Sequence, residues 1–207
     1  MPDKIEILES LEADAAEILC LQYAAYQSEA ELNNDFTIQP LMQTPDELIA
    51  EYRKGVILKA VRNGEIVGSV RAYAEGDTVY IGKLMVRPDC QGKGLGKRLL
   101  AAMESKLSKK RFELFTSGKS ERNLYLYEKA GYKRFKEGTD KSGITFVYFE
   151  KKADASAGIA LGMCFGAAVG VVIGTFTDNI GIWIPIGAAI GLAIGASFPL
   201  LKNGREK

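Results

Sequence analysis

The stretch QGKGLGK at residues 91–97 combines three glycines with two lysines, a composition typical of loops that bind phosphate. Glycine has no Cβ, so the backbone N–H groups at 92, 94 and 96 can approach phosphate oxygens closely. A helix is predicted to begin at Leu95, and its positive N-terminal end would stabilise an anion. Lys93, Lys97 and Arg98 add positive charge. The stretch therefore predicts a diphosphate site, although a glycine-rich helix start without a ligand accounts equally well for these residues alone.

Two common nucleotide loops do not fit this stretch. The P-loop requires GxxxxGK followed by Ser or Thr, and Arg98 stands where the hydroxyl is needed. The dinucleotide fingerprint requires a third glycine at the position of Leu99, and no ribose-binding acid occurs in the expected context. What does fit is Gln-x-x-Gly-x-Gly, Gln91 to Gly96, directly after a predicted strand that ends Val86-x-Pro88. This pattern resembles the acyl-CoA pyrophosphate loop of the GNAT acetyltransferase superfamily.

A second signature of that superfamily is resembled by residues 112–132, FELFTSGKSERNLYLYEKAGY. The family pattern is Ser-x-x-Asn-x-x-x-Tyr-Glu-Lys-x-Gly-Tyr, and Asn123 and Tyr127 are four residues apart on one face of the predicted helix. In the family, the equivalent Asn contacts the cofactor side of the site, and the equivalent Tyr is the usual proton donor to the departing CoA thiolate. The resemblance thus implies acetyl-CoA as co-substrate and Tyr127 as a catalytic residue. Packing of Tyr127 in the core is the alternative.

The same resemblance assigns a role to the predicted strand 78–86. In the family this strand carries a bulge and separates from its neighbour, so that free amides bind the pantetheine arm and polarise the acetyl carbonyl. The letters KLMV do not themselves show a bulge. The cofactor contacts that the resemblance implies are Leu84, Met85, Val86, Gln91, Gly92, Lys93, Gly94, Leu95, Gly96, Lys97 and Asn123.

The sequence gives weaker evidence for the residues that would bind the acetyl acceptor. The chain has no histidine, so a general base must be a carboxylate, a water molecule or the N-terminal amine. By the resemblance, residues 28–44 line the acceptor pocket, and they offer Glu29 and Glu31 as weak candidates for the base. Asp35 and Tyr80 are further candidates. Solvated charges on a loop are the alternative for each.

The resemblance covers about residues 3–152 and implies an N-acetyltransferase in which an amine attacks the acetyl group directly. Cys90 neighbours the loop but lacks an activating base, so no covalent acetyl-enzyme is expected. Two alternatives come from other functional classes. One is a non-catalytic acyl-CoA sensor, and the other is a glycine-zipper membrane assembly module that the soluble domain regulates.

Periodicity and turn signals predict the elements that must position these residues. Thr44-Pro45-Asp46-Glu47 is a capping box that opens a helix, and Asn63-Gly64 is a hairpin turn. Strands are predicted at 4–8, 56–62, 65–75, 78–86, 111–116, 132–137 and 144–151, and helices at 11–27, 44–54, 95–107 and 120–131, with 29–43 irregular. The order predicts an α/β domain complete by about Lys152, and the resemblance makes it GNAT-like, with a mixed, mostly antiparallel central sheet flanked by helices.

Charge is distributed unevenly along the 207 residues. The formal net charge is +1, which implies no strongly acidic or basic partner and no nucleic acid. Three scattered cysteines without CxxC spacing, and the lack of histidine, argue against a disulfide framework or a metal site. The acidic, amphipathic N-terminus does not resemble a signal peptide, so this domain is expected in the cytoplasm. Between Ala155 and Leu201, however, Asp178 is the only charged residue.

The tail at 153–207, which contains this nearly charge-free stretch, is predicted to form a transmembrane hairpin. Its two spans are about 157–176 and 180–201, and twenty helical residues reach about 30 Å, the thickness of the hydrocarbon core. Glycine recurs every fourth residue, at 158, 162, 166, 170 and 174 and again at 187, 191 and 195. In lipid, such a stripe becomes a flat groove for close helix packing. The tail resembles a glycine-zipper hairpin, and a buried soluble hairpin is the alternative.

The charges that flank the hairpin predict its orientation. Lys151 and Lys152 precede the first span, and Lys202, Arg205 and Lys207 follow the second. Positive flanks stay on the cytoplasmic side, so a multi-pass protein of the cell membrane with both termini in the cytoplasm is expected. The sequence leaves open whether the glycine stripes pack within the hairpin or join copies into a homo-oligomer.

Overall fold

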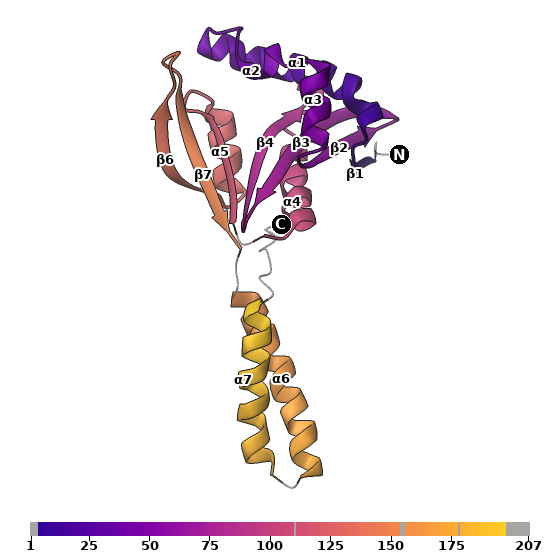
Figure 1. Cartoon of the computed structure of the whole chain (residues 1–207), viewed down its shortest axis with the longest axis vertical. Helices are drawn as coiled ribbons and strands as arrows, with labels where there is room; N and C mark the ends of the chain where they lie inside the picture. Colours follow the sequence, from indigo (N-terminus) through magenta and orange to yellow (C-terminus); the bar gives the residue numbers. More distant parts are fainter. Residues whose placement is uncertain (1–3, 110, 154–155, 178, 198–207) are drawn as a thin grey trace. The chain divides into compact units, whose positions relative to one another are not determined.

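The structure is a computed structural model that describes residues 4–109, 111–153, 156–177 and 179–197 (Figure 1). The chain divides into two compact units, residues 1–107 with 111–151 and residues 108–110 with 152–207. Each unit is described by itself.

A mixed sheet is the framework of the first unit. Among the described residues it has seven strands in the order β1-β2-β3-β4-β5-β7-β6. The pairs β1–β2, β2–β3, β3–β4 and β6–β7 are antiparallel, and β4–β5 is parallel. The strands are β1 Ile5–Glu9, β2 Val56–Arg62, β3 Glu65–Glu75, β4 Thr78–Val86, β5 Arg111–Ser117, β6 Lys133–Thr139 and β7 Thr145–Lys152. The predicted mixed, mostly antiparallel sheet is confirmed.

Helices flank this sheet, and all of them except α2 lie where the sequence predicts a helix. They are α1 Ala15–Asn33, α2 Gln39–Met42, α3 Pro45–Tyr52, α4 Leu95–Leu107 and α5 Glu121–Lys129, with short 3₁₀ turns at Glu12–Asp14 and Pro88–Cys90. The predicted capping box opens α3, because the Glu47 N–H donates to Thr44 Oγ1 at 3.3 Å and the Thr44 N–H donates to Glu47 Oε2 at 2.9 Å. The predicted hairpin turn is also present, with Asn63 and Gly64 both at positive φ, 54° and 86°.

The core of this unit fixes the helices on the sheet. Ile18 of α1 and Leu48 of α3 are fully buried and pack in one cluster with Ile57 of β2. On α4, Leu99 is fully buried and lies against β3, where a Cβ added to Gly68 would stand 3.0 Å from Leu99 Cδ1. Burying a leucine or isoleucine side chain contributes roughly 1.5–3 kcal/mol. These contacts hold α1, α3 and α4 on the sheet.

The predicted irregular segment 29–43 is wrong in part. Helix α1 continues to Asn33 and ends where Asn34 adopts a left-handed φ of 53°, and α2 occupies Gln39–Met42. The last turns of α1 lack a continuous apolar stripe, which is why the periodicity fades before Glu29. They are held instead by polar contacts, because Ser117 Oγ donates to Asn33 Oδ1 at 2.8 Å. Helix α1 thus reaches from its core position to the end of β5.

The second unit is a pair of helices, α6 Ser156–Phe176 and α7 Ile180–Ser197, that lie side by side (Figure 1). Their glycines face one another. A Cβ added to Gly162 would stand 2.1 Å from the Gly191 carbonyl oxygen, one on Gly166 2.0 Å from that of Gly187, and one on Gly170 2.2 Å from that of Trp183. These glycines of α6 and α7 therefore pack against each other within the hairpin.

The hairpin exposes apolar side chains on its other faces, among them Phe165, Phe176 and Ile194, which are 68%, 87% and 55% exposed. Within 161–176 and 180–196, where its side chains are described, neither helix combines the length and the apolar character needed to cross a membrane. Asp178, the side chains of 157–160 and residues 198–207, with the flanking charges Lys202, Arg205 and Lys207, lie outside the described residues.

Candidate active site

The centre of the candidate site is a β-bulge in β4. Arg71 of β3 pairs with Gly82, and Ser69 pairs with Met85, so the single residue between them on β3 faces both Lys83 and Leu84. Lys83 has a positive φ of 49°, which is uncommon for a residue with a side chain. The bulge that the family resemblance implies is confirmed. It bends the strand and increases its twist at this point.

Next to the bulge, strands β4 and β5 separate from each other (Figure 1). Their parallel pairing runs only from Thr78–Arg111 to Tyr80–Glu113 and does not continue through the described residues beyond. From Ile81 to Val86, β4 therefore has no strand on this side. An unpaired strand edge presents backbone N–H and C=O groups that must be satisfied by another molecule or by water. Leu84 and Val86 lie on this edge, as the resemblance requires.

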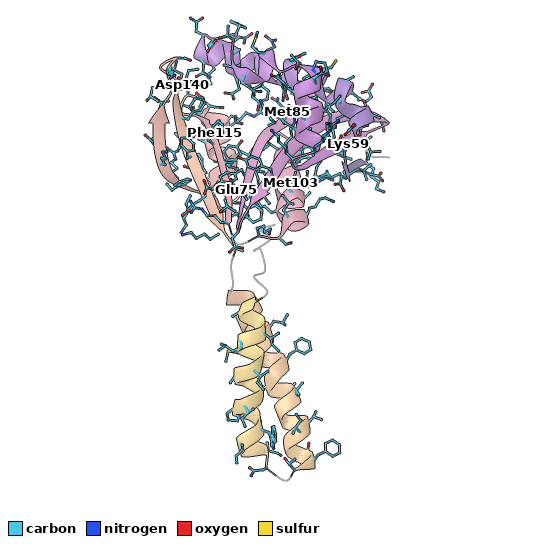
Figure 2. The ribbon with its side chains drawn as sticks, viewed as in Figure 1. Lys59, Glu75, Met85, Met103, Phe115 and Asp140 are labelled. Atoms are coloured by element: carbon cyan, nitrogen blue, oxygen red, sulfur yellow. The ribbon has the colours of Figure 1, made fainter. Side chains whose placement is uncertain are left out.

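Met85 lies between them but turns into the core. It is 2% exposed and packs in the same cluster as Ile18 and Leu48. Figure 2 labels Met85 in the first unit. Its side chain is thus out of reach of a ligand on the strand edge, and only its backbone is available as the predicted cofactor contact. Burial of Met85 instead anchors the bulge, because shifting the strand would open a cavity in the core.

The glycine loop continues directly from this edge. Gly92 and Gly94 both have left-handed φ values, 76° and 77°, and no atom lies within 4 Å of a Cβ added to either. Their conformation, not lack of space, requires glycine. Gln91 ties the loop to the strand, since its Nε2 donates to the Val86 carbonyl oxygen at 2.8 Å and Arg122 bonds to its Oε1.

Helix α4 starts immediately after these glycines. Its first hydrogen bond runs from the Arg98 N–H to the Gly94 carbonyl at 3.1 Å, and the N–H groups of the first turn have no partner within the helix. Lys93 and Lys97 are exposed beside them. Arg98, in contrast, donates to the Ile5 carbonyl of β1 at 2.8 Å. The loop is thus an open array of N–H groups and lysines, and Arg98 is engaged elsewhere.

Gly96 has a packing role in addition to the backbone contact predicted for it. It lies inside α4, and an added Cβ would stand 3.3 Å from Leu126 Cδ2 of α5. The third glycine of the motif therefore allows two helices to approach. Leu95 is buried, 2% exposed, so of the predicted contacts it offers only its backbone N–H.

Helix α5 brings Asn123 and Tyr127 to the same end of the sheet. Asn123 Nδ2 donates to Glu29 Oε1 at 3.0 Å and to Thr116 Oγ1 at 3.3 Å, and so joins α5 to α1 and β5. Tyr127 is 7% exposed and packs on Phe149 and Tyr132, with ring centroids 5.7 and 6.3 Å away. Tyr127 is thus partly a core residue, as the alternative held, yet its hydroxyl makes no hydrogen bond to the residues that the structure describes.

Burial raises the pKa of Tyr127 above its ordinary value, and its neighbours Tyr26 and Glu29 raise it further. The phenol therefore stays protonated at neutral pH and can serve as a hydrogen-bond donor. The same effects raise the pKa of Tyr26, where burial is the largest cause and Glu29 adds to it. Tyr26 and Glu29 thus lie close enough to Tyr127 to raise its pKa, which places the three side chains in one group.

Of the predicted carboxylates, the structure brings only Glu29 to this group. Its Oε1 accepts hydrogen bonds from Ser120 Oγ at 2.6 Å and from Asn123. Ser120 directly precedes α5, and its hydroxyl donates to Glu29 instead of capping the helix. Glu31 is exposed on another side of α1. Asp35 accepts hydrogen bonds from Thr37 in its own turn.

Tyr80, the remaining candidate, stacks on Tyr73 with ring centroids 5.1 Å apart. No group of three or more Cys, Asp or Glu side chains within the described part of the chain could hold a metal ion. Of Glu29, Glu31 and Asp35, Glu29 is the one that hydrogen-bonds to Ser120 and to Asn123 of α5.

A buried polar network beside the bulge was not predicted. Arg71, 5% exposed, donates to Gln22 at 2.5 Å, to Gln43 at 2.9 Å and to Glu51 at 2.8 Å. It locks α1 and α3 onto β3 opposite Gly82. Sequence reasoning missed it because the alternation in a strand marks which residues share a face but not that a charged residue on that face is buried.

Comparisons with known proteins agree with this geometry. The model of the acetyltransferase (GNAT) domain family matches residues 25–153. That of the glycine zipper membrane protein family matches residues 150–199. No curated protein matches the chain in sequence.

Solved structures with the same fold are numerous. The PaiA N-acetyltransferase from Thermoplasma acidophilum, in complex with coenzyme A, is 18% identical with a TM-score of 0.61, over 72% of this chain and 99% of its own. The ribosomal-protein-S18-alanine N-acetyltransferase from Escherichia coli is 14% identical with a TM-score of 0.59, over 72% and 94%. The yncA protein from Salmonella typhimurium, with its cofactor acetyl-CoA, is 18% identical with a TM-score of 0.58, over 73% and 95%. At these identities the likeness concerns the fold.

Proposed function

Because the chain belongs to the GNAT family of acetyl-CoA-dependent N-acetyltransferases, we propose that its first unit transfers an acetyl group from acetyl-CoA to an amine at the β4 bulge. The observation that carries the proposal is the continuity of the site. The unpaired, bulged edge of β4 leads through the 3₁₀ turn at Pro88–Cys90 into Gly92 and Gly94 and the N-terminus of α4. A ligand with a diphosphate at one end and an extended amide-bearing arm at the other fits such a surface.

Each part of acetyl-CoA has its own binding group in this proposal. The diphosphate binds the N–H groups of the loop and the first turn of α4, with Lys93 and Lys97 beside it. The pantetheine arm pairs with the free edge of β4 near Leu84 and Val86. A backbone N–H at the bulge donates to the thioester carbonyl oxygen and stabilises the negative charge that develops there when the amine attacks.

The amine must lose a proton to attack, and Glu29 is the proposed base, directly or through water. Two donors hold its Oε1, which leaves Oε2 for the amine side. After attack, the C–S bond breaks and the CoA thiolate leaves. A thiol has a pKa of roughly 8.5 and a tyrosine roughly 10, and burial raises the pKa of Tyr127 further. Tyr127 therefore acts mainly as a hydrogen-bond donor that stabilises the thiolate.

Direct transfer, without an acetyl-enzyme, follows from the position of Cys90. It is 2% exposed, and its Sγ lies 3.4 Å from Asp89 Oδ1. Burial keeps this sulfur out of reach of a substrate on the surface of the loop. Cys90 is thus a structural residue beneath the loop.

Calorimetric titration of acetyl-CoA into the full chain tests the binding site. We expect the parent to bind and Gly94→Glu to lose binding by at least about 100-fold, because the substitution strains a left-handed residue and adds negative charge where the diphosphate sits. Gly76→Glu is the matched control. Gly76 has a φ of 56° and equally open surroundings, but it lies in the turn between β3 and β4. A folded parent that binds no acetyl-CoA, or equal losses in both variants, would refute the proposal.

We further propose that the second unit anchors this enzyme to a lipid bilayer, with both termini in the cytoplasm. The proposal rests on the charge-free runs at 157–176 and 180–201, on the match of 150–199 to a glycine zipper membrane protein family and on the exposed apolar side chains of α6 and α7. Packing of the glycine faces against each other leaves those side chains directed outward, where lipid would cover them.

Flotation with lipid vesicles tests the anchor. The full chain should float with the vesicles and a chain that ends at Ala153 should not. For the orientation, Asn179→Cys at the tip should react with an impermeant thiol reagent applied from outside intact cells. Recovery of the full chain away from the vesicles would contradict the anchor, and labelling of the tip only after lysis would contradict the orientation.

A further inference from the structure

Lys83 occupies an unusual position for a lysine. It is the first residue of the bulge, with a φ of 49°, in a region where residues other than glycine, asparagine and aspartate are uncommon. The backbone strain of such residues persists only where the surroundings enforce it. Here the buried Met85 and the pairing of Gly82 with Arg71 hold both sides of the bulge. The lysine is thus fixed at the proposed thioester position.

The side chain of Lys83 is directed toward the acceptor side of the site. Its Nζ donates to Gln39 of α2 and lies 5.8 Å from the centre of the Tyr26 ring of α1. Gln39 belongs to the segment expected to line the acceptor pocket. Tyr26 is one of the two neighbouring groups that raise the pKa of Tyr127. The amine therefore lies in the group of side chains to which the reaction has been assigned.

The amine also lacks the ion pair that would make it inert. Lys59 shows the usual arrangement, with its Nζ 2.6 Å from Asp14 Oδ2. For Lys83 no carboxylate lies within ion-pair distance among the described residues. Burial and the charge of Arg71 lower the pKa of Lys83 to about 8, against the weaker opposing effect of Glu51 and Glu47. A substantial fraction of the amine is therefore neutral and nucleophilic near that pH.

We propose that Lys83 Nζ is itself an acetyl acceptor, so that the enzyme acetylates its own bulge when acetyl-CoA is bound and no other amine is present. This inference rests on the proposed function. The neutral Nζ attacks the thioester carbonyl carbon, a C–N bond forms, and the C–S bond breaks with its electron pair on sulfur. The nitrogen gives up one proton to Glu29 or water, and the CoA thiolate accepts a hydrogen bond from Tyr127 and then a proton from solvent. The products are Nε-acetyl-lysine and CoA.

Peptide mapping by mass spectrometry tests this inference. The purified full chain is incubated with acetyl-CoA and no added amine. We expect one acetyl group per chain, located at Lys83, and at least a 10-fold lower yield at that residue in Gly94→Glu, which lacks the diphosphate site. Lys83→Arg keeps the positive charge but offers no nucleophilic amine and should remain unmodified, whereas Lys59→Arg should be modified like the parent.

The pH dependence gives an independent readout. The charged and titratable groups that face the Lys83 amine are Arg71 on β3, Glu47 and Glu51 on α3, and Tyr26 on α1. Because deprotonation of the amine is required, the rate of self-acetylation should rise about 10-fold per pH unit below pH 8 and level off above it. An ordinary exposed lysine would continue to gain until about pH 10.

The outcomes separate this inference from the proposed function. A parent that binds acetyl-CoA calorimetrically but carries no acetyl group at Lys83 would overturn the inference alone. Modification spread over exposed lysines, equal in the parent and in Gly94→Glu, would overturn it as well, since the chemistry would then be unassisted. A parent that binds no acetyl-CoA would overturn both.

Discussion

Glycine is concentrated in two regions of this molecule, the 91–97 loop and the facing surfaces of α6 and α7, and the comparison shows two unrelated reasons for its use. In the loop, Gly92 and Gly94 have left-handed backbones and open space around them. In the hairpin, Gly166 and Gly187 lie in helices, and an added Cβ on either would stand 2.0 to 2.1 Å from the carbonyl oxygen of the other. The loop needs a conformation, whereas the hairpin needs room.

This difference follows from what each region packs against. The loop leaves its N–H groups uncovered, so a ligand can approach a backbone that no Cβ shields. The hairpin brings two backbones into direct contact, which only glycine allows at this distance. Substitutions in the hairpin should therefore be harmful according to the volume that they add. Substitutions in the loop should be harmful according to how poorly the new residue adopts a left-handed backbone.

The largest effect is expected for Gly166→Ala. Alanine is the better helix former by about 1 kcal/mol, but the added methyl group would force the two backbones apart, and overpacking of this kind costs roughly 1–3 kcal/mol or more. We expect a net loss of about 2 kcal/mol in the free energy of unfolding of the hairpin. Detergent-titration unfolding of the full chain can measure it through Trp183, since the chain has a single tryptophan and it lies on α7.

Gly181→Ala is the control for that loss. Gly181 is also in α7, but no atom lies within 4 Å of its added Cβ, so helix propensity alone should act. The variant should be unchanged or more stable by up to about 1 kcal/mol. Equal destabilisation by the two substitutions would mean that volume is not what distinguishes the stripe.

The sequence predicted these two regions unequally. The hairpin stripe was visible because its period of four matches one face of a helix, but a period does not say which surface the face meets. That α6 and α7 meet each other depends on the turn at Asn179, whose backbone accepts a hydrogen bond from the Trp183 N–H, and on close backbone contacts that no local pattern encodes.

In the first unit, hereafter the enzyme unit, local sequence signals predicted the helices and strands well, whereas the long-range polar contacts were not predicted. The bounds of β4 and α4 follow from proline, glycine and apolar spacing, and the structure has them as predicted. The extension of α1 to Asn33 and the burial of Arg71 depend on partners far along the chain, Ser117 in one case and Glu51 in the other. The family resemblance, not the letters, indicated the bulge, because a bulge is a mismatch between two strands and neither strand shows it alone.

A smaller effect, caused by backbone conformation and not by volume, is expected for Gly94→Ala. The methyl group meets nothing, but a left-handed backbone costs an alanine about 1–2 kcal/mol, so the free loop would relax away from the binding conformation. We expect the Kd for acetyl-CoA to rise about 10-fold in calorimetry, with the thermal stability of the enzyme unit nearly unchanged. Gly94→Asn should recover most of the affinity, because asparagine tolerates this conformation better than other residues.

Asparagine should be better than alanine at Gly94 but worse than alanine at Gly166. At Gly166 it should be worse than alanine, because it is larger and the backbone there needs no left-handed residue. If Gly94→Asn bound acetyl-CoA no better than Gly94→Ala, the loop would also be limited by room, and the distinction between the two regions would fail.

The smallest effect is expected for Gly96→Ala. This variant tests whether one motif contains glycines required for backbone conformation together with a glycine required for close packing. Gly96 is helical, and its added Cβ would stand 3.3 Å from the end of the flexible Leu126 side chain. Leu126 can yield by a few tenths of an ångström, and the gain in helix propensity of about 1 kcal/mol offsets the crowding. Calorimetry should therefore show an acetyl-CoA affinity within about 3-fold of the parent, since 3-fold corresponds to roughly 0.7 kcal/mol.

Gly96→Val should in contrast lower the stability of the enzyme unit, and Leu126→Ala in the same chain should restore part of it, because the two side chains compete for one space. These outcomes would place Gly96 with the hairpin glycines, although its sequence motif places it with Gly92 and Gly94. A Gly96→Ala variant that lost as much affinity as Gly94→Ala would show the reverse. The cofactor itself would then fill the space beside Gly96, and all three glycines would act as one phosphate site.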